Sequence, residues 1–332
     1  MSTAIRTRGL GKSFRSRIKP PGLRGAAAGL FRPQWTSVDA VAHLDLELQS
    51  GDMLAFIGPN GAGKSTTIKM LTGILYPNAG ELSVLGLDPH RNRRELARRI
   101  GTVFGQKSQL WFHLPPGDTY TLLGAIYDIE TPVLRSRVAH LTEAFDLGGL
   151  LDIPTRKLSL GQRIRCEIAA SLLHKPDILF LDEPSIGLDV VAKKRLRTLI
   201  RRINEEDGVT VFLTSHDAGD IETIGRRAVV INGGRSVWEG TVKELKYSLL
   251  NTRIIDVKLA EANPVVPNLD GVRLLKSREW SFKLEVDLDR TETARVVAAI
   301  TGSNAVADIT VNAAPLEDII ARMYRGEVGG AP

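Results

Sequence analysis

Residues 52–73, DMLAFIGPNGAGKSTTIKMLTG, restrict the possible folds of this chain more than any other stretch. A short apolar run, a glycine-rich turn and an apolar-periodic segment follow one another, which predicts a strand, a loop and a helix. Within them, G-x-x-x-x-G-K-S is the pattern of a phosphate-binding loop, in the context that this pattern requires. Its glycines allow backbone N–H groups to converge on phosphate oxygens, and the helix N-terminus adds its dipole. The predicted nucleotide-binding residues are Gly58, Pro59, Asn60, Gly61, Ala62, Gly63, Lys64, Ser65 and Thr66.

A second apolar segment, DILFLDEP at 177–184, ends in two carboxylates. It is typical of a parallel strand buried on both faces, and such sheets place ligands at the carboxyl ends of their strands. We expect Asp182 to hold Mg²⁺ through water, the Ser65 hydroxyl to ligate Mg²⁺, and Lys64 to bridge the β- and γ-phosphates. Glu183 would polarise the attacking water as general base, an effect worth about 10²–10⁴-fold. The alternative for Glu183 is an acidic cap at the end of the strand.

Composition excludes several other classes of protein. At 332 residues, 43% hydrophobic and 25% charged, the chain has the composition of a soluble globular protein with one large and one smaller domain. No apolar stretch approaches the roughly 18 residues of a membrane span, and the start, MSTAIRTRGLGKSF, contains no signal-peptide core. The single cysteine, Cys166, excludes an internal disulfide, fits a reducing cytoplasm and is expected to pack in the interior.

The net charge of +6 is concentrated at the N-terminus. Residues 1–38 contain eight basic side chains and no acidic one, so subtracting their +8 from +6 leaves −2 for the remainder. A protein that binds nucleic acid needs basic charge spread over a binding face. We therefore expect no nucleic-acid partner.

Four further motifs accompany the phosphate loop. They are Gln106 in TVFGQKSQLW, LSLGQ at 158–162, SIGLD at 185–189 and His216 in VFLTSH. With these motifs in this order, the chain from about residue 3 to about residue 245 resembles the ATP-binding subunit of ABC transporters. The resemblance implies an α/β fold, a P-loop NTPase of ABC type with a mixed sheet core and a helical insert at about 107–175.

The resemblance also implies a role for each motif. Gln106 would sense the γ-phosphate and Mg²⁺ and contact the membrane subunit, His216 would contact the γ-phosphate, and Asp189 would lie at the interface between two ATPase subunits. The signature of one subunit would close over ATP held by the other, so that ATP favours a closed dimer. The implied partners are a second ATPase subunit, as a homodimer, and a separate membrane permease. The signature residues are Ser159, Gly161 and Gln162.

The signature departs from the usual Leu-Ser-Gly-Gly-Gln because Leu160 occupies the first glycine position. A leucine resists positive φ, so we predict a right-handed backbone there. Ser159 and Gln162 have the spacing of a capping box. Gly161 has no such local explanation, since glycine costs about 1 kcal/mol against alanine inside a helix. We predict that its bare backbone approaches the γ-phosphate held by another copy; Leu-Ser-Leu-Gly-Gln is similar to the signature of a bacterial export-type branch.

The residue that stacks on adenine is open to three interpretations. In the family an aromatic residue at the end of the first strand has this role, and Phe14 stands at that place. Because the next strand is predicted to start only near Val38, the stretch between them is unusually long. Phe31 and Trp35 are therefore the alternatives to Phe14.

Two segments are candidates for contact with a membrane or a membrane subunit. The basic insertion at about 15–36 would touch anionic lipid headgroups or the permease, or would be a solvated loop without a partner. Trp111 and Phe112, just after Gln106, would line a groove for a helix of the membrane subunit, or would be buried inside the helical insert.

The chain beyond about residue 246 lacks further motifs of this kind. WSFKLEVDLD at 280–289 alternates apolar and polar residues, which predicts a half-buried strand, and RIIDVKL is a second candidate. TARVVAAI and PLEDIIARMY have helical periodicity. We predict an ABC ATPase domain over 1–246 and a small α+β accessory domain over 247–332, with a ferredoxin-like fold as the candidate.

The predicted function is that of the ATP-hydrolysing subunit of an ABC exporter, with ATP and Mg²⁺ as cofactors. An importer subunit with a regulatory C-terminal domain is the alternative, and a soluble ABC ATPase acting on nucleic acid or ribosomes is a distant one. Proteins of that last class need long coiled coils, zinc-binding cysteines or two ATPase units. None of these fits in 332 residues with one phosphate loop and one cysteine. The expected location is cytoplasmic, peripheral on the inner face of the cell membrane through the permease.

Overall fold

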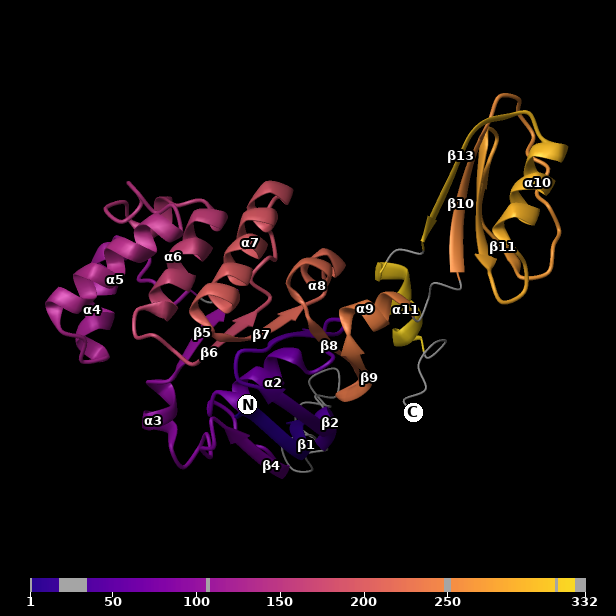
Figure 1. The fold of residues 1–332 in the computed structure, drawn as a ribbon. Helices are drawn as coiled ribbons and strands as arrows, with labels where there is room; N and C mark the ends of the chain where they lie inside the picture. The colour runs from indigo at the N-terminus through magenta and orange to yellow at the C-terminus, as the bar shows by residue number, and fades with distance from the viewer. Residues whose placement is uncertain (1, 18–34, 106–107, 248–251, 314–315, 326–332) are drawn as a thin grey trace, which may run out of the picture. The chain divides into compact units, whose positions relative to one another are not determined.

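The chain divides into two compact units between Gly240 and Thr241. The boundary predicted from the sequence lies after residue 246, so helix α9 (Val242–Tyr247) falls in the second unit. Each unit has its own sheet structure and its own hydrophobic core. The computed structural model (Figure 1) describes residues 2–17, 35–105, 108–247, 252–313 and 316–325.

A six-stranded sheet with the order β5-β6-β7-β3-β8-β9 forms the centre of the first unit. From β5 to β8, each pair of neighbours is parallel. Nearly every residue of β3, β6 and β7 is buried, as expected of parallel strands covered on both faces. Their carboxyl ends therefore meet at one edge of the sheet. The strands are β3 (Met53–Ile57), β5 (Ile100–Phe104), β6 (Ile178–Asp182), β7 (Thr210–Ser215), β8 (Arg227–Asn232) and β9 (Arg235–Thr241).

A second, antiparallel sheet with the order β2-β1-β4 packs on the first. Its strands are β1 (Thr3–Arg17), β2 (Trp35–Gln49) and β4 (Ala79–Val84). Side chains of β1 and β2 share one core with those of β3 and of helix α2 (Lys64–Leu71). The predicted mixed sheet core is thus confirmed.

The two faces of the six-stranded sheet bury different side chains, because successive residues of a strand point to opposite faces. Phe56, Phe180 and Phe212 lie in the core shared with the antiparallel sheet. The ring centroid of Phe212 is 5.2 Å from that of Phe56 and 5.7 Å from that of Phe180. Leu179 and Leu181, on either side of Phe180, lie instead in the core beneath the helices.

Helices cover this other face, and those between β5 and β6 gather in one group (Figure 1). Trp111 and Phe112 precede this group and are 46% and 53% exposed. The alternative that they are buried inside the helical insert is therefore wrong. The helices of the first unit after α2 are α3 (Arg93–Ala97), α4 (Pro116–Ile126), α5 (Thr131–Ala144), the 3-10 turn Thr155–Lys157, α6 (Leu160–Leu172), α7 (Val190–Asp207) and α8 (Ala218–Ile224).

The second unit contains an antiparallel sheet with the order β11-β12-β10-β13, and its predicted α+β class is confirmed. Phe282, Leu284 and Val286 of β12 are buried against Val296 and Ile300 of α10. Trp280, predicted to share the face of these strand residues, precedes the strand and is 53% exposed. The elements are β10 (Thr252–Leu259), β11 (Val272–Arg278), β12 (Ser281–Asp287), α10 (Thr293–Ser303), β13 (Val306–Ala313) and α11 (Leu316–Tyr324).

The ferredoxin-like candidate agrees with the strand order but not with every element. β10 lies between β12 and β13, and β12 lies between β10 and β11, as in two interleaved split β–x–β units. A helix, α10, connects β12 to β13. Residues 260–271, which connect β10 to β11, are not helical, whereas a ferredoxin-like fold has a helix at this place.

Phe14 lies inside a strand rather than at its end. β1 continues to Arg17, and Phe14 pairs with Val38 of β2. The ring is 41% exposed, and Lys12 Nζ lies 5.5 Å from its centroid, a cation–π distance. The hairpin is longer than the sequence suggested because the pairing of β1 with β2 continues past Phe14.

Both ends of the predicted basic insertion belong to the paired strands β1 and β2. Trp35, the first residue of β2, is 60% exposed. Residues 18–34 lie outside the described part of the chain, and so does Phe31. What the structure describes of the predicted 15–36 insertion is therefore strand.

Candidate active site

The phosphate loop connects β3 to α2 at the carboxyl edge of the six-stranded sheet. Glycine is needed at its positions for different physical reasons. Gly63 has φ of 105°, and a Cβ there would lie 2.2 Å from the carbonyl oxygen of Ala40. A Cβ at Gly58 would lie 2.7 Å from the carbonyl oxygen of Ile231. Gly61 has φ of 83° but open space where its Cβ would be. The loop therefore needs glycine for room at two positions and for backbone conformation at Gly61 and Gly63.

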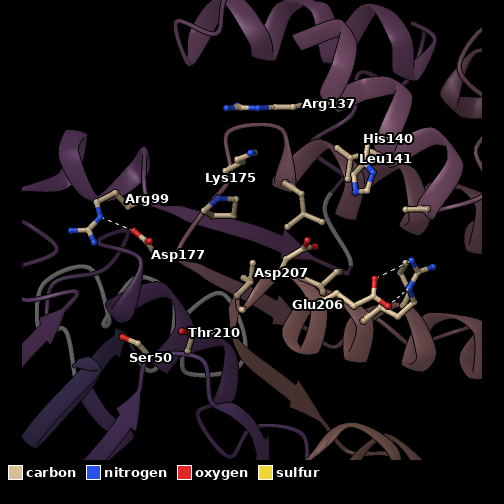
Figure 2. Close-up of a pocket in the computed structure, with 18 of the residues that line it drawn as sticks. Ser50, Arg99, Arg137, His140, Leu141, Lys175, Asp177, Glu206, Asp207 and Thr210 are labelled. Atoms are coloured by element: carbon tan, nitrogen blue, oxygen red, sulfur yellow. Dashed lines mark hydrogen bonds and ion pairs between the residues drawn. The ribbon is translucent and has the colours of Figure 1, made fainter. Parts of the chain in front are cut away.

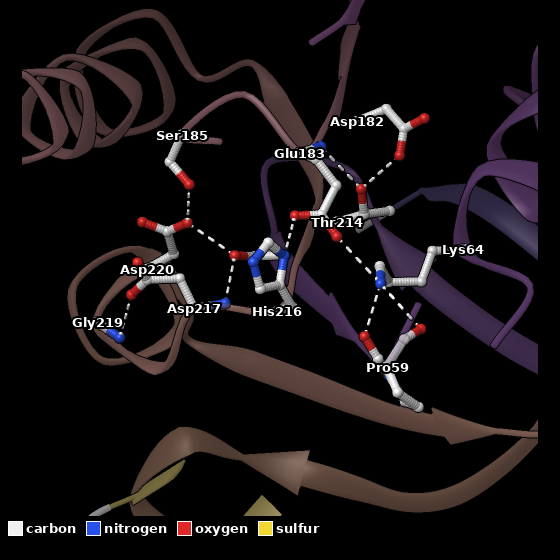
Figure 3. A network of polar contacts seen from close by, with 12 residues as sticks. Pro59, Lys64, Asp182, Glu183, Ser185, Thr214, His216, Asp217, Gly219 and Asp220 are labelled. Atoms are coloured by element: carbon white, nitrogen blue, oxygen red, sulfur yellow. Dashed lines mark hydrogen bonds and ion pairs between the residues drawn. The ribbon is translucent and has the colours of Figure 1, made fainter. Parts of the chain in front are cut away.

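Lys64, the first residue of α2, turns its ammonium group back across the loop (Figure 3). Nζ donates to the carbonyl oxygens of Gly58 at 2.6 Å and of Pro59 at 3.2 Å. It also lies 3.0 Å from Glu183 Oε1. The Lys64 side chain is only 6% exposed, so its charge depends on these oxygens for compensation.

Glu183 follows β6 with a strained backbone and a carboxylate between two cationic or polar groups. Its φ is 53°, in the left-handed region that few residues other than glycine adopt. Oε1 faces Lys64, while Oε2 lies 2.6 Å from His216 Nδ1. Strain of this kind persists where the surroundings fix it and is concentrated at functional sites. Glu183 and His216, which directly follow the neighbouring strands β6 and β7, are thus in contact.

Thr214, on β7, is a site residue that the sequence reasoning missed. Its Oγ1 donates to Asp182 Oδ1 at 2.7 Å and accepts the backbone N–H of Glu183 at 3.0 Å. One hydroxyl therefore orients both residues at the end of β6. The available signal was a threonine two residues before His216, but the parallel register that pairs it with Asp182 is a tertiary property.

The signature forms the start of α6, and its predicted capping box is confirmed. Ser159 Oγ accepts Gln162 N–H at 3.2 Å, and Gln162 Oε1 accepts Ser159 N–H at 2.8 Å. Leu160 is the first helical residue, without positive φ, so its right-handed backbone is also confirmed. A Cβ at Gly161 would lie 3.3 Å from Ala192 Cβ on α7. The close approach of α6 to α7 within one chain therefore favours glycine at position 161, which the sequence did not reveal.

Asp189 caps α7, since its Oδ1 accepts the N–H of Ala192 at 2.8 Å. The next two residues, Val190 and Val191, are 83% and 63% exposed. The start of α7 therefore combines a satisfied polar cap with an exposed apolar surface.

The structure brings some of the predicted site residues together. Lys64, Glu183 and His216 are joined by direct contacts, and Asp182 is joined to them through Thr214 (Figure 3). The hydrogen bonds shown for Ser159 and Asp189 are to residues of their own helices. Gln106, predicted for catalysis and Mg²⁺, lies outside the described residues.

A pocket of about 960 Å³ lies elsewhere in the first unit (Figure 2). Thr210, which starts β7, and Asp177, which precedes β6, line it, so it opens at the amino ends of these strands. The phosphate loop and Glu183 lie at the opposite, carboxyl edge. Its lining carries charge of both signs: Arg137 and Lys175 are basic and Asp207 is acidic. Two ion pairs, Arg99–Asp177 and Arg202–Glu206, also line it. This pocket therefore does not coincide with the predicted nucleotide site.

Cys166 packs in the interior, as predicted. It is fully buried on α6, and burial raises the pKa of its thiol to about 11. A neutral buried thiol is a poor nucleophile. Among the described stretches of chain, no helix is both long enough and apolar enough to cross a lipid bilayer.

A strand, a glycine-rich loop and a helix with Lys64 at its start, beside a strand that ends in Asp182 and Glu183, define a phosphate-loop NTPase. The family model described as ABC transporter matches residues 41–186. The daunorubicin/doxorubicin resistance ATP-binding protein DrrA of Streptomyces peucetius is 35% identical over 82% of this chain and 80% of its own length. The chain therefore belongs to the ABC transporter family and is an ATPase of that family.

Other relatives agree with this assignment, and a solved structure shares the fold. The bacitracin transport ATP-binding protein BcrA of Bacillus licheniformis is 31% identical over 69% of this chain and 73% of its own length. The probable multidrug ABC transporter ATP-binding protein YbhF of Escherichia coli is 32% identical over 67% of this chain, which spans 38% of YbhF. The dimeric ADP- and Pi-bound structure of the ATP-binding cassette MJ0796 aligns with a TM-score of 0.59 at 23% identity, over 72% of this chain and 98% of that one. This last likeness supports the fold alone.

Proposed function

We propose that the chain powers an ABC exporter by ATP-driven closure of a dimer that is coupled to a separate membrane permease. The observation that carries this proposal is the contact chain Lys64–Glu183–His216 at the phosphate loop, in a protein whose relatives are named for drug resistance and bacitracin transport. The proposed location is the inner face of the cell membrane, through the permease.

In the proposed reaction, the phosphates of ATP bind to the loop of residues 58–66. Lys64 exchanges its contacts with loop carbonyls and Glu183 for contacts with the β- and γ-phosphates. Glu183 then accepts a proton from the attacking water as the new P–O bond forms and the bond to ADP breaks. His216, 2.6 Å from the Glu183 carboxylate, holds the general base in position and would contact the γ-phosphate of bound ATP.

The residues present fit Mg²⁺. Ser65 and Asp182 offer hydroxyl and carboxylate oxygens, the hard donors that this cation prefers. The described residues contain no cluster of three His, Cys, Asp or Glu side chains that could cage a metal, and Mg²⁺ needs none when phosphates and water complete its shell. Bound with ATP, Mg²⁺ would neutralise phosphate charge; Ser65, Asp182 and Gln106 are proposed to hold it.

The proposed dimer contact uses the signature and the start of α7. Ser159, Gly161 and Gln162 would approach ATP bound to the partner, and Asp189 would lie at the interface. The exposed Val190 and Val191 beside Asp189 support this, because an apolar surface of this kind is available for a second copy.

The proposed permease contact uses Trp111 and Phe112. Both rings are about half exposed, and Leu114 beside them is 40% exposed. Exposed aromatic side chains of this size are typical of protein–protein interfaces. The role of Phe14 as the adenine-stacking residue stays a proposal, supported by its partly exposed ring.

The substitution Glu183→Gln tests the mechanism. We expect ATP binding to persist, turnover to fall by about 10²–10⁴-fold, and light scattering to show an ATP-dependent dimer. Glu206→Gln, an exposed carboxylate near the other end of α7, is the matched control and should change neither property. Near-normal turnover in Glu183→Gln would remove Glu183 as general base, and a monomer with ATP bound would contradict the closed dimer.

The direction of transport is tested in cells that express Lys64→Ala. If the chain powers export, these cells accumulate an anthracycline or bacitracin to higher levels than wild-type cells. Unchanged accumulation of such compounds, together with reduced uptake of a nutrient, would favour the importer alternative.

A further inference from the structure

A buried carboxylate outside the phosphate loop joins four separate pieces of the first unit. Asp220, on α8, is 1% exposed. Its Oδ2 accepts hydrogen bonds from the hydroxyls of Ser185 at 2.5 Å (Figure 3) and of Ser215 at 2.7 Å. Its Oδ1 accepts a hydrogen bond from Arg197 Nε at 2.7 Å. Burying an ionised carboxylate is costly unless hydrogen bonds and an opposite charge compensate it, and both are present here.

Arg197, on α7, is itself held in place. Its Nη2 donates to Asp217 Oδ1 at 3.0 Å, and Lys193, one turn earlier, pairs with the same carboxylate at 2.5 Å. Burial alone would raise the pKa of Asp217, but the hydrogen bond and charge of Lys193, with the charge of Arg197, lower it. A Cβ at Gly219 would lie 2.8 Å from Arg197 Nη2, so glycine leaves room for the guanidinium group.

The two serines that bond to Asp220 flank the proposed catalytic pair, Glu183 and His216. Ser185 comes two residues after Glu183, and Ser215 comes directly before His216. Glu183 and His216 contact each other across neighbouring strands at 2.6 Å. The Asp220 carboxylate therefore ties together the two backbone segments that carry this pair.

We propose that Asp220, held by Arg197, is a positioning residue for ATP hydrolysis that fixes Glu183 against His216 without contacting the nucleotide; this rests on the roles proposed above for Glu183 and His216. A misplacement of about 1 Å can cost about 10²-fold in rate. Loosening the Asp220 contacts should therefore lower kcat. It should leave ATP binding nearly unchanged, because binding depends on the loop of residues 58–66.

Two variants change the contacts in different ways. Asp220→Asn removes the charge while keeping the size of the side chain, and Gly219→Ala displaces the Arg197 guanidinium without changing any charge. We expect kcat to fall by about 10–100-fold in both, with KM and the Kd of a fluorescent ATP analogue within about twofold of wild type. Asp177→Asn breaks an Arg–Asp pair at the other edge of the sheet and is the control that should retain kcat.

Folding is measured in parallel by circular dichroism and thermal unfolding. The proposal is overturned if either variant, fully folded at the assay temperature, keeps kcat within twofold of wild type. It is also overturned if kcat falls only in proportion to the unfolded fraction, or if KM rises while kcat stays constant. A folded protein that binds ATP normally but turns over slowly would support it.

Discussion

At the scale of single residues, the phosphate-loop glycines serve separate physical purposes. Gly61 and Gly63 both have positive φ, a conformation that costs an L-residue about 1–2 kcal/mol. Of these two, only Gly63 also faces a backbone atom, the Ala40 carbonyl oxygen, at a distance that a Cβ atom does not tolerate. The motif pattern treats these glycines alike, although the structure places different demands on each.

We predict that Gly61→Ala lowers the free energy of unfolding by about 1–2 kcal/mol, the cost of left-handed backbone alone. Gly63→Ala should cost more, because Ala40 lies on a paired strand and cannot withdraw without disturbing β2. Urea denaturation without nucleotide measures both. Equal losses in the two variants would show that the contact with Ala40 is not limiting.

A second residue-scale feature is the buried acid Glu167 on α6. It is 1% exposed, and within the described part of the chain its Oε1 accepts no hydrogen bond, with Arg163 Nε 3.8 Å away. Burial raises its pKa above the ordinary 4.5, although a hydrogen bond from Ser108 and the charge of Arg163 oppose the rise. The unfolded chain therefore releases this proton at lower pH than the folded chain does.

Glu167→Gln should remove a pH dependence of stability. Below pH 4.5 the carboxyl group is protonated in both states; as pH rises towards the folded-state pKa, the folded wild type loses stability and the variant does not. We expect the variant to be more stable than wild type at pH 7, by an amount that shrinks towards pH 4.5. Urea denaturation across this range measures it; a difference independent of pH would contradict a buried, ionising Glu167.

At the scale of elements, the start of α6 combines two functions. The capping box of Ser159 and Gln162 satisfies its first N–H groups, and Gly161 lets the helix approach Ala192 of α7. Leu160 also contacts this region, since a Cβ at Gly187 would lie 3.1 Å from Leu160 Cδ2. The signature therefore packs against the segment after β6 within one chain.

The substitution Gly161→Ala distinguishes two reasons for glycine at this position: packing against Ala192 in the same chain, and the proposed approach to ATP bound by a partner subunit. The gain in helix propensity, about 1 kcal/mol, should largely offset the tight contact with Ala192, so stability should change by no more than about 1 kcal/mol. ATP hydrolysis should nevertheless fall at least about tenfold if the backbone approaches ATP on a partner. Ser159→Asn, which keeps a good N-cap, is the stability control. Loss of several kcal/mol with normal turnover would assign Gly161 to packing alone.

At the scale of the whole molecule, the chain contains two compact units with separate cores. Phe180 lies in a core of the first unit and Phe282 in that of the second, and each is at most 2% exposed. No residue of the predicted ATP site lies in the second unit. Stability and activity should therefore respond to the two units separately.

We expect Phe282→Ala to destabilise the second unit by about 3–5 kcal/mol while ATP hydrolysis is retained. Phe180→Ala should destabilise the first unit by a similar amount and lower the temperature at which activity is lost. Differential scanning calorimetry, with limited proteolysis to assign each transition, distinguishes them. A single transition that shifts equally in both variants would show that the units unfold together.

The sequence by itself determined what depends on short spacings. The strand–loop–helix around Lys64, the capping box at Ser159 and the backbone of Leu160 follow from neighbouring residues and from hydrogen bonds within one turn. The strand of residues 281–287 follows from a two-residue period. These features need no knowledge of what packs against them, because local sterics and amphipathicity already specify them.

Only the tertiary structure decided which distant segments meet. Thr214 gained its role from a parallel register, Asp220 from the approach of two strand ends and α7, and Gly161 from the position of Ala192. The tertiary structure also decided that Trp111 is exposed, whereas the sequence allowed either exposure or burial. The physical reason is that a sheet edge brings together residues far apart in the chain, and their pairing depends on strand order and on packing against neighbouring elements.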